Sequence, residues 1–141
     1  MLAPVPEELS DLVDFHGDYC PGLVIGYRVT MLALRELGVR KVEDEKLVAI
    51  CETNACPVDA IKFLTGCLPQ RGNLIVRNRG KQVFAFGRSK DDKMIRIALR
   101  PGAFGEIDAP TPSERRRIML EWLWELPDDQ LFDVRWEPRS E

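Results

Sequence analysis

A chain of 141 residues is long enough for one globular domain with a buried core, and 45% hydrophobic with 30% charged residues is typical of a soluble protein. The net charge of −3 gives no indication of a nucleic-acid-binding protein. The first residues, MLAPVPEELSDL, lack the cationic start and apolar stretch of a secretory signal. We therefore expect a single domain over residues 1–141, in the cytoplasm, with its four cysteines reduced and serving as thiols or metal ligands.

Two helices are predicted first. Residues 6–14 (PEELSDLVD) place acidic residues in the first helical turn, which the helix dipole favours. Residues 21–37 begin with proline, are apolar on almost all sides and are followed by Gly38, a helix-ending residue. This segment contains two arginines and is shorter than the roughly 20 residues of a membrane span, so we interpret it as a buried helix. Gly22 and Gly26, four residues apart, would let another backbone approach it closely.

The middle of the chain combines strands with a further helix. Leu47–Cys51 (LVAIC) is a continuous apolar run, which indicates a strand buried on both faces. Residues 57–65 predict a helix that starts with proline and ends at Gly66. Residues 73–77, 82–87 and 94–100 are then predicted to be strands. Short turns at 78–81 and 89–92 would join them into an antiparallel meander.

The remaining residues predict a helix and an apolar tail. Thr111-Pro112-Ser113-Glu114 forms a capping box with proline at the first helical position, and Pro127 ends the helix. Its arginines at 115–117 are flanked by acidic residues and indicate a solvated face. The tail 131–136 is too apolar for a free terminus, so we expect residues 111–141 to pack on the domain or at a dimer interface.

The order helix, helix, strand, helix, three strands and helix predicts an α+β fold on a mixed sheet. Only the first strand can belong to a parallel crossover, because the other three are joined by short turns.

Two Cys-Pro pairs stand immediately before predicted helices, at Cys20-Pro21 and Cys56-Pro57. A thiolate at such a position faces unpaired backbone N–H groups and the positive end of the helix dipole, which can lower its pKa. If the two helices pack side by side with their starts at the same edge, both sulfurs would share one pocket.

His16 and Asp18 precede Cys20 by four and two residues, so the three side chains can converge in a turn. Imidazole and thiolate suit zinc first, with iron, copper or nickel as alternatives. An ordinary structural interpretation fits as well: His16 caps a helix, Asp18 forms a turn and Cys20 is a small buried hydrophobe. The spacing alone does not separate the two.

Four further residues have open roles. Cys51 ends an apolar strand and is interpreted as a core residue. Cys67 follows a helix end, where the dipole disfavours a thiolate, which leaves packing or site lining. Asp59, the third residue of its helix, is interpreted as a cap, and Asn73 either forms a turn or faces a ligand.

Two stretches of the chain resemble the FmdE family of formylmethanofuran dehydrogenase proteins: FHGDYCPGLVIGYR, and AICETNACPVDAIKFLTGCLPQRGNLIVRNRGKQVFAF. The motifs H-G-x-x-C-P-G, C-x-x-D-A-I, L-T-G-C and G-N-L occur in the family's order between residues 12 and 88. The resemblance implies an α+β core, commonly a dimer, and a cleft in which a metal can bind. Carried over to this chain, the cleft would hold His16, Cys20, Cys56, Asp59 and Cys67, with Asn73 nearby.

The sequence departs from the family at two points. The family usually has H-G-H in the first motif, and Asp18 replaces the second histidine with a harder ligand. Many members carry a zinc ribbon of paired C-x-x-C motifs, but no cysteine follows Cys67, so that module is not expected. FmdE proteins accompany a molybdenum or tungsten enzyme of one-carbon metabolism, and the motifs do not imply a catalytic role of their own.

Three functional hypotheses follow. The first is a metal-binding protein with a redox or one-carbon role, whose metal ligands would be His16, Asp18, Cys20 and Cys56. Its remaining cofactor-binding residues would be Asp59, Cys67 and Asn73. The second is a non-catalytic accessory subunit of a larger oxidoreductase. The third is a metal-free thiol enzyme with Cys20 or Cys56 as nucleophile and His16 as base. A homodimer is expected, with no nucleic-acid or membrane partner.

Overall fold

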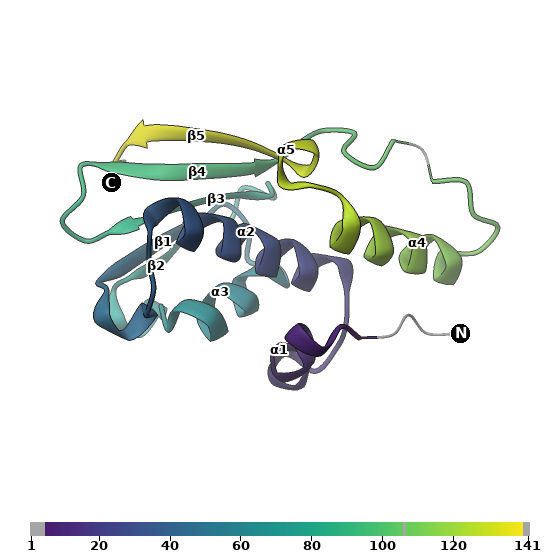
Figure 1. Cartoon of the computed structure of the whole chain (residues 1–141), viewed down its shortest axis with the longest axis horizontal. Coiled ribbons are helices and arrows are strands. Elements are labelled where there is room, and N and C mark those ends of the chain that lie inside the picture. Colours follow the sequence, from purple (N-terminus) through teal and green to yellow (C-terminus); the bar gives the residue numbers. More distant parts are fainter. Residues whose placement is uncertain (1–4, 106, 140–141) are drawn as a thin grey trace.

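The computed structural model describes residues 5–105 and 107–139, which form a mixed five-stranded sheet with its long helices on one side (Figure 1). The helices are α1 (Ser10–His16), α2 (Pro21–Leu37), α3 (Pro57–Thr65), α4 (Pro112–Glu125) and α5 (Asp128–Leu131). The strands are β1 (Leu47–Cys51), β2 (Leu74–Val76), β3 (Val83–Arg88), β4 (Lys93–Leu99) and β5 (Phe132–Pro138). Short 3-10 helices lie at Glu7–Leu9, Val42–Asp44 and Pro69–Arg71. The predicted α+β class is confirmed.

The bounds of α2 and α3 agree with the prediction because each helix has a local start and stop signal. Both begin at a proline, and both end at a glycine in the left-handed region, Gly38 at φ 70° and Gly66 at φ 74°. The first predicted helix, 6–14, is split between a 3-10 turn and α1 and extends to His16. Gly17, at φ 95°, ends it there.

The antiparallel meander consists of other strands than the sequence predicted. β1 lies between β2 and β3, so the turn at 78–81 does not join neighbouring strands. β1 pairs with β2 in parallel and with β3 antiparallel. The backbone N–H and C=O groups of a buried strand need partners along both edges, and the crossover through α3 places β2 at one of them. The antiparallel meander therefore consists of β3, β4 and β5.

The apolar tail is the edge strand β5. It pairs with β4 from Leu99↔Phe132 to Lys93↔Pro138, so the tail packs on its own domain. Whether residues 111–141 also form a dimer interface stays a prediction.

The two faces of the sheet differ in what covers them. The main core lies under the helices and joins side chains such as Phe84 and Ile97 of the sheet to Leu23 and Ile61 of α2 and α3. A small second cluster on the opposite face consists, among the described residues, of strand residues alone: Val48, Ile50, Ile75, Ala85 and Met94. No helix of the described chain has the length and hydropathy needed to cross a bilayer.

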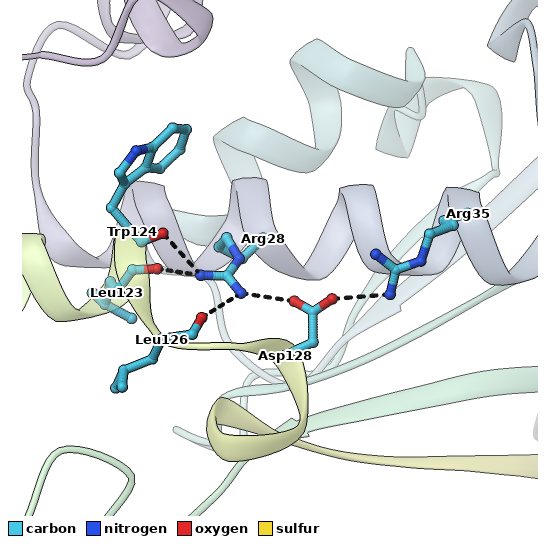
Figure 2. A network of polar contacts seen from close by, with 6 residues as sticks. All are labelled: Arg28, Arg35, Leu123, Trp124, Leu126 and Asp128. Carbon is cyan, nitrogen blue, oxygen red and sulfur yellow. Dashed lines mark hydrogen bonds and ion pairs between the residues drawn. The ribbon is translucent and has the colours of Figure 1, made fainter.

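A polar network fastens the C-terminal helices to α2 (Figure 2). Arg28 donates to the carbonyl oxygens of Leu123, at 2.6 Å, and Leu126, at 2.7 Å, near the end of α4. The last carbonyl groups of a helix lack partners within it, and here a guanidinium group satisfies them. Arg28 also contacts one carboxylate oxygen of Asp128 at 2.8 Å, and Arg35 contacts the other at 2.9 Å. Two residues of α2 thus hold the start of α5 and the end of α4.

Candidate metal centre

Three side chains that the sequence separates by up to 40 positions meet at the starts of α2 and α3. His16, Cys20 and Cys56 each offer one ligand atom, and these atoms lie within 4.8 Å of one another. Cys20 immediately precedes α2 and Cys56 immediately precedes α3. The prediction that the two helix starts come together is confirmed.

The first two residues of this group are positioned by a tight connection between helices. His16 is the last residue of α1, and Gly17 reverses the chain in the left-handed conformation that glycine adopts without strain. Cys20 then takes an extended conformation as the N-cap residue of α2, and it is buried. The imidazole and the sulfur are therefore brought together locally, with Nε2 of His16 3.7 Å from Sγ of Cys20.

Cys56 arrives from a distant part of the chain because α2 and α3 approach each other closely. A Cβ atom at Gly26 would lie 2.6 Å from the carbonyl oxygen of Pro57, and one at Gly22 would lie 3.0 Å from Cβ of Cys56. Both distances are shorter than the ordinary contacts of a Cβ atom with neighbouring heavy atoms. The absence of side chains at these two glycines allows the start of α3 to reach Cys20. The sequence predicted a close backbone approach at this face, and the structure identifies the approaching segment.

Asp59, in the first turn of α3, fixes the orientation of the histidine ring. Its Oδ2 lies 2.8 Å from Nδ1 of His16, whose side chain is 14% exposed. A carboxylate can only accept, so Nδ1 donates in this bond, and in the neutral ring the lone pair of Nε2 is directed toward Cys20. This is the arrangement by which a second carboxylate orients a metal-binding histidine.

The electrostatic environment of Cys20 differs from the expectation for a helix start. Burial, with a smaller contribution from the neighbouring Cys56, raises its pKa to about 11, against the lowering by the backbone N–H of Leu23. The predicted lowering of the thiol pKa is therefore wrong for Cys20, because desolvation outweighs the helix start. Without a cation nearby, this sulfur stays protonated at neutral pH.

The comparisons with known proteins agree with the resemblance seen in the sequence. The family model described as "FmdE, Molybdenum formylmethanofuran dehydrogenase operon" matches residues 15–133. The chain belongs to the FmdE family. A solved structure, a tungsten formylmethanofuran dehydrogenase FmdE-like protein from Syntrophus aciditrophicus, superposes with a TM-score of 0.74 at 25% identity. The match covers 95% of this chain and 72% of that one.

A curated relative matches a shorter stretch. The chain is 36% identical over 90 residues to a "Probable S-adenosyl-L-methionine-binding protein" of Archaeoglobus fulgidus. This match covers 60% of the chain but only 24% of the relative, so the chain spans about a quarter of that protein's length.

Asp18, which replaces a histidine usual in the FmdE family, has a different partner in this chain. Its carboxylate accepts a hydrogen bond of 2.9 Å from Nη2 of Arg116 on α4, and its side chain is 60% exposed. The same nitrogen donates to the carbonyl oxygen of Tyr19 at 2.8 Å. The hydrogen bond with Arg116 lowers the pKa of Asp18. The structure thus pairs this predicted ligand with an arginine, and the group of three ligand atoms forms without it.

Cys67 and Asn73 lie beyond the opposite end of α3 from Cys56. The Cys67 thiol is buried and faces the carbonyl oxygen of Leu47 at 3.5 Å. The side-chain oxygen of Asn73 accepts from the backbone N–H of Leu68 at 2.8 Å, which is the role of a turn residue. Their predicted part in cofactor binding stays a prediction, and it would require a site distinct from the three-residue group.

Cys51 has the core position that the sequence predicted. It is fully buried, and burial raises its pKa to about 12. Arg116 was missed, because its run of arginines indicated only a solvated face. No signal in the local sequence reports a contact with Asp18, which lies 98 residues away.

Proposed function

We propose that the protein binds one divalent transition metal ion through Nε2 of His16 and the sulfurs of Cys20 and Cys56. The observation that supports this proposal is the convergence of three metal-ligating atoms within 4.8 Å from three separate elements. One nitrogen and two sulfurs are a donor set for zinc, with iron and nickel as alternatives. Three protein ligands are the number that catalytic zinc sites use, where the remaining position takes water or a substrate.

The residues of the chain prepare this site in distinct ways. Asp59 holds the proton on Nδ1 of His16, so that Nε2 is free to bind. The burial of Cys20 excludes water from its sulfur. A bound metal ion would supply the positive charge that converts both thiols to thiolates, and it would act as a Lewis acid.

A metal-free thiol enzyme is the less favoured alternative. His16 would be the base of such an enzyme, but burial raises the pKa of Cys20 to about 11, which disfavours the thiolate that has to attack. Metal binding uses the same three side chains, and the positive charge of the ion would stabilise the Cys20 thiolate.

We further propose a cytoplasmic homodimer with a redox or one-carbon role, which associates with a larger molybdenum or tungsten oxidoreductase as an accessory subunit. Membership of the FmdE family and the description of the Syntrophus aciditrophicus neighbour support this assignment. Affinity purification from the native source tests it, because an accessory subunit is recovered with a stoichiometric partner. Recovery of the protein alone would contradict the accessory role and leave the metal site standing.

Titration of metal-free protein with Co²⁺ tests the metal site. We expect saturation near one equivalent per chain, with the intense near-ultraviolet absorption of cobalt–thiolate bonds. Cys20→Ser and Cys56→Ser should each weaken both binding and this absorption. Cys67→Ser is the matched control, because Cys67 is a buried cysteine outside the group of His16, Cys20 and Cys56. Serine at this position keeps a hydrogen-bond donor for the Leu47 carbonyl. Absence of uptake, or uptake that Cys20→Ser leaves unchanged, would overturn the proposal.

A further inference from the structure

A hollow lies on the face of the sheet that the long helices leave uncovered. Its centre is Ala85 in β3, which pairs with Ile50 in β1 on one side and with Arg96 in β4 on the other. Paired residues of neighbouring strands point to the same face of a sheet, so a small methyl group stands between two long side chains. The resulting cavity has a volume of about 360 Å³.

The floor of the cavity is apolar and its rim is charged. Side chains of the second hydrophobic cluster and its neighbours form the floor: Ile50, Val83, Ala85 and Met94. Cationic side chains around the rim are Arg77, Arg79, Lys81 and Arg96. Two carboxylates, Glu52 and Glu137, also line it.

The cations approach from two sides of the hollow. The backbone N–H groups of Arg79 and Lys81 both donate to the carbonyl oxygen of Glu52, at 2.9 and 3.1 Å. The N–H of Arg77 donates to the carbonyl oxygen of Cys51 at 2.8 Å. These bonds fix residues 77–81 at the end of β1, whereas Arg96 comes from β4. A ligand in the hollow would meet positive charge at both ends.

The two carboxylates neutralise this charge only in part. Arg79, Lys81 and Arg96 alone outnumber the two acids of the lining, although the whole chain has a net charge of −3. Glu52 lies 3.4 Å from Arg79, whose side chain is 60% exposed, and Glu137 lies 3.9 Å from Arg96. Both contacts are longer than ordinary charge-assisted hydrogen bonds, so an anion can replace them at small cost.

We propose that this hollow binds a small organic anion, with its apolar body on the floor at Ala85 and its carboxylate, phosphate or sulfonate group at the arginine rim. The volume lies within the range of small-molecule sites, and a charged rim beside an apolar floor suits an anion with an apolar body. A second copy of the chain is a poor occupant, because a two-fold interface centred on the hollow would bring together two surfaces with the same surplus of positive charge. The site is separate from His16, Cys20 and Cys56, so this proposal does not depend on metal binding.

Anilinonaphthalene sulfonate is a suitable probe, because it combines a flat apolar body with one anionic group. A fluorescence titration gives its affinity, and amide-resonance shifts in two-dimensional NMR locate its site. We expect the largest shifts at Ala85, Arg96 and residues 77–81. Phenyl phosphate should displace the probe, and added salt should weaken binding.

Variants separate the shape of the hollow from its charge. Ala85→Leu fills the floor without removing a charge and should raise the Kd at least about tenfold. Ala98→Leu is the matched control, on the same face of β4 but outside the cavity lining, and it should leave the Kd unchanged. Arg96→Gln should raise the Kd about threefold to fivefold, whereas Arg117→Gln on α4 should not. If Ala85→Leu fails to fold, Arg96→Gln and the shift map still decide the question.

Other results would overturn the inference. Shifts confined to the helices, or equal probe affinity in the native protein and Ala85→Leu, would show that the hollow is not the site. A change of oligomeric state in Ala85→Leu, measured by light scattering without the probe, would instead identify this face as an interface between copies of the chain.

Discussion

His16 and Asp59 are joined by a hydrogen bond of 2.8 Å between Nδ1 and Oδ2, although 43 residues separate them in the sequence. The bond links the last residue of α1 to the first turn of α3. It leaves Nε2 of the same ring facing Cys20 at 3.7 Å. One contact therefore joins two helices and also sets which nitrogen of the only histidine in the chain can bind a metal.

Replacing Asp59 with alanine should lower metal affinity by roughly 10- to 100-fold, because the ring loses the partner that orients it. Co²⁺ titration measures the effect. Asp14→Ala is the matched control, since Asp14 is an exposed carboxylate on α1, two residues before His16, and we expect native affinity. Equal affinities for the native protein and Asp59→Ala would contradict the orienting role.

Gly26→Ala should destabilise the protein by about 1–3 kcal/mol, the usual cost of overpacking. The added Cβ would lie 2.6 Å from the Pro57 carbonyl oxygen and would push α3 and Cys56 away from Cys20. Helix propensity alone predicts the opposite sign, because replacing glycine with alanine inside a helix stabilises it by about 0.8–1 kcal/mol. Urea unfolding distinguishes the two, and metal affinity should fall in parallel.

Gly22→Ala provides a graded comparison for this contact. Its Cβ would lie 3.0 Å from Cβ of Cys56, a milder overlap with a side chain instead of backbone. We expect a smaller loss of stability than in Gly26→Ala. A larger loss at Gly22 would show that the close approach at Gly26 is not what limits the packing of α2 on α3.

Arg116→Gln should weaken metal binding several-fold with little change in the melting temperature. Arg116 holds Asp18 and the Tyr19 carbonyl, which lie between the two ligands His16 and Cys20. Because the pair is exposed, its contribution to global stability is about 0–1 kcal/mol. Arg117→Gln is the control, since Arg117 pairs along its own helix with Glu121, at 2.9 Å. Identical affinities in the two variants would exclude a positioning role for Arg116.

Asp128→Asn should destabilise the protein at neutral pH by about 1 kcal/mol after solvent screening. Burial raises the pKa of Asp128, but the hydrogen bonds from Arg28 and Arg35 lower it more, so its pKa in the folded protein lies below the ordinary value of 3.8. A group with a depressed pKa stabilises the fold above its unfolded pKa, and this contribution is lost as the pH falls through the folded value.

Thermal unfolding of the native protein and Asp128→Asn across this range checks the sign. The difference in stability should be full above about pH 4 and should shrink as the solution is made more acidic. Asp129→Asn, at the adjacent exposed position, should show no such difference. If the difference in stability between the native protein and Asp128→Asn stays constant down to strongly acidic pH, the proposed ion pairs are ruled out.

The helices were predictable to the residue where a proline and a glycine mark their ends, as in α2 and α3. These signals act within one or two turns of backbone, so they can be identified without knowing the fold. The order of the strands was not predictable in the same way. The short turn at 78–81 suggested that β2 and β3 are neighbours, yet β1 pairs with both of them, because the backbone groups of this buried strand need hydrogen-bond partners along both edges.

The sequence alone determined the chemistry of the candidate site, since it placed two cysteines before proline-initiated helices and provided the glycines that let those helices meet. Only the tertiary structure decided how these residues are used. It gave His16 its carboxylate partner, paired Asp18 with Arg116 across 98 residues, and buried Cys20 so that its thiol pKa rises instead of falling. Local torsion preferences and periodicity depend on neighbouring residues, whereas desolvation and long-range pairing depend on which elements pack together.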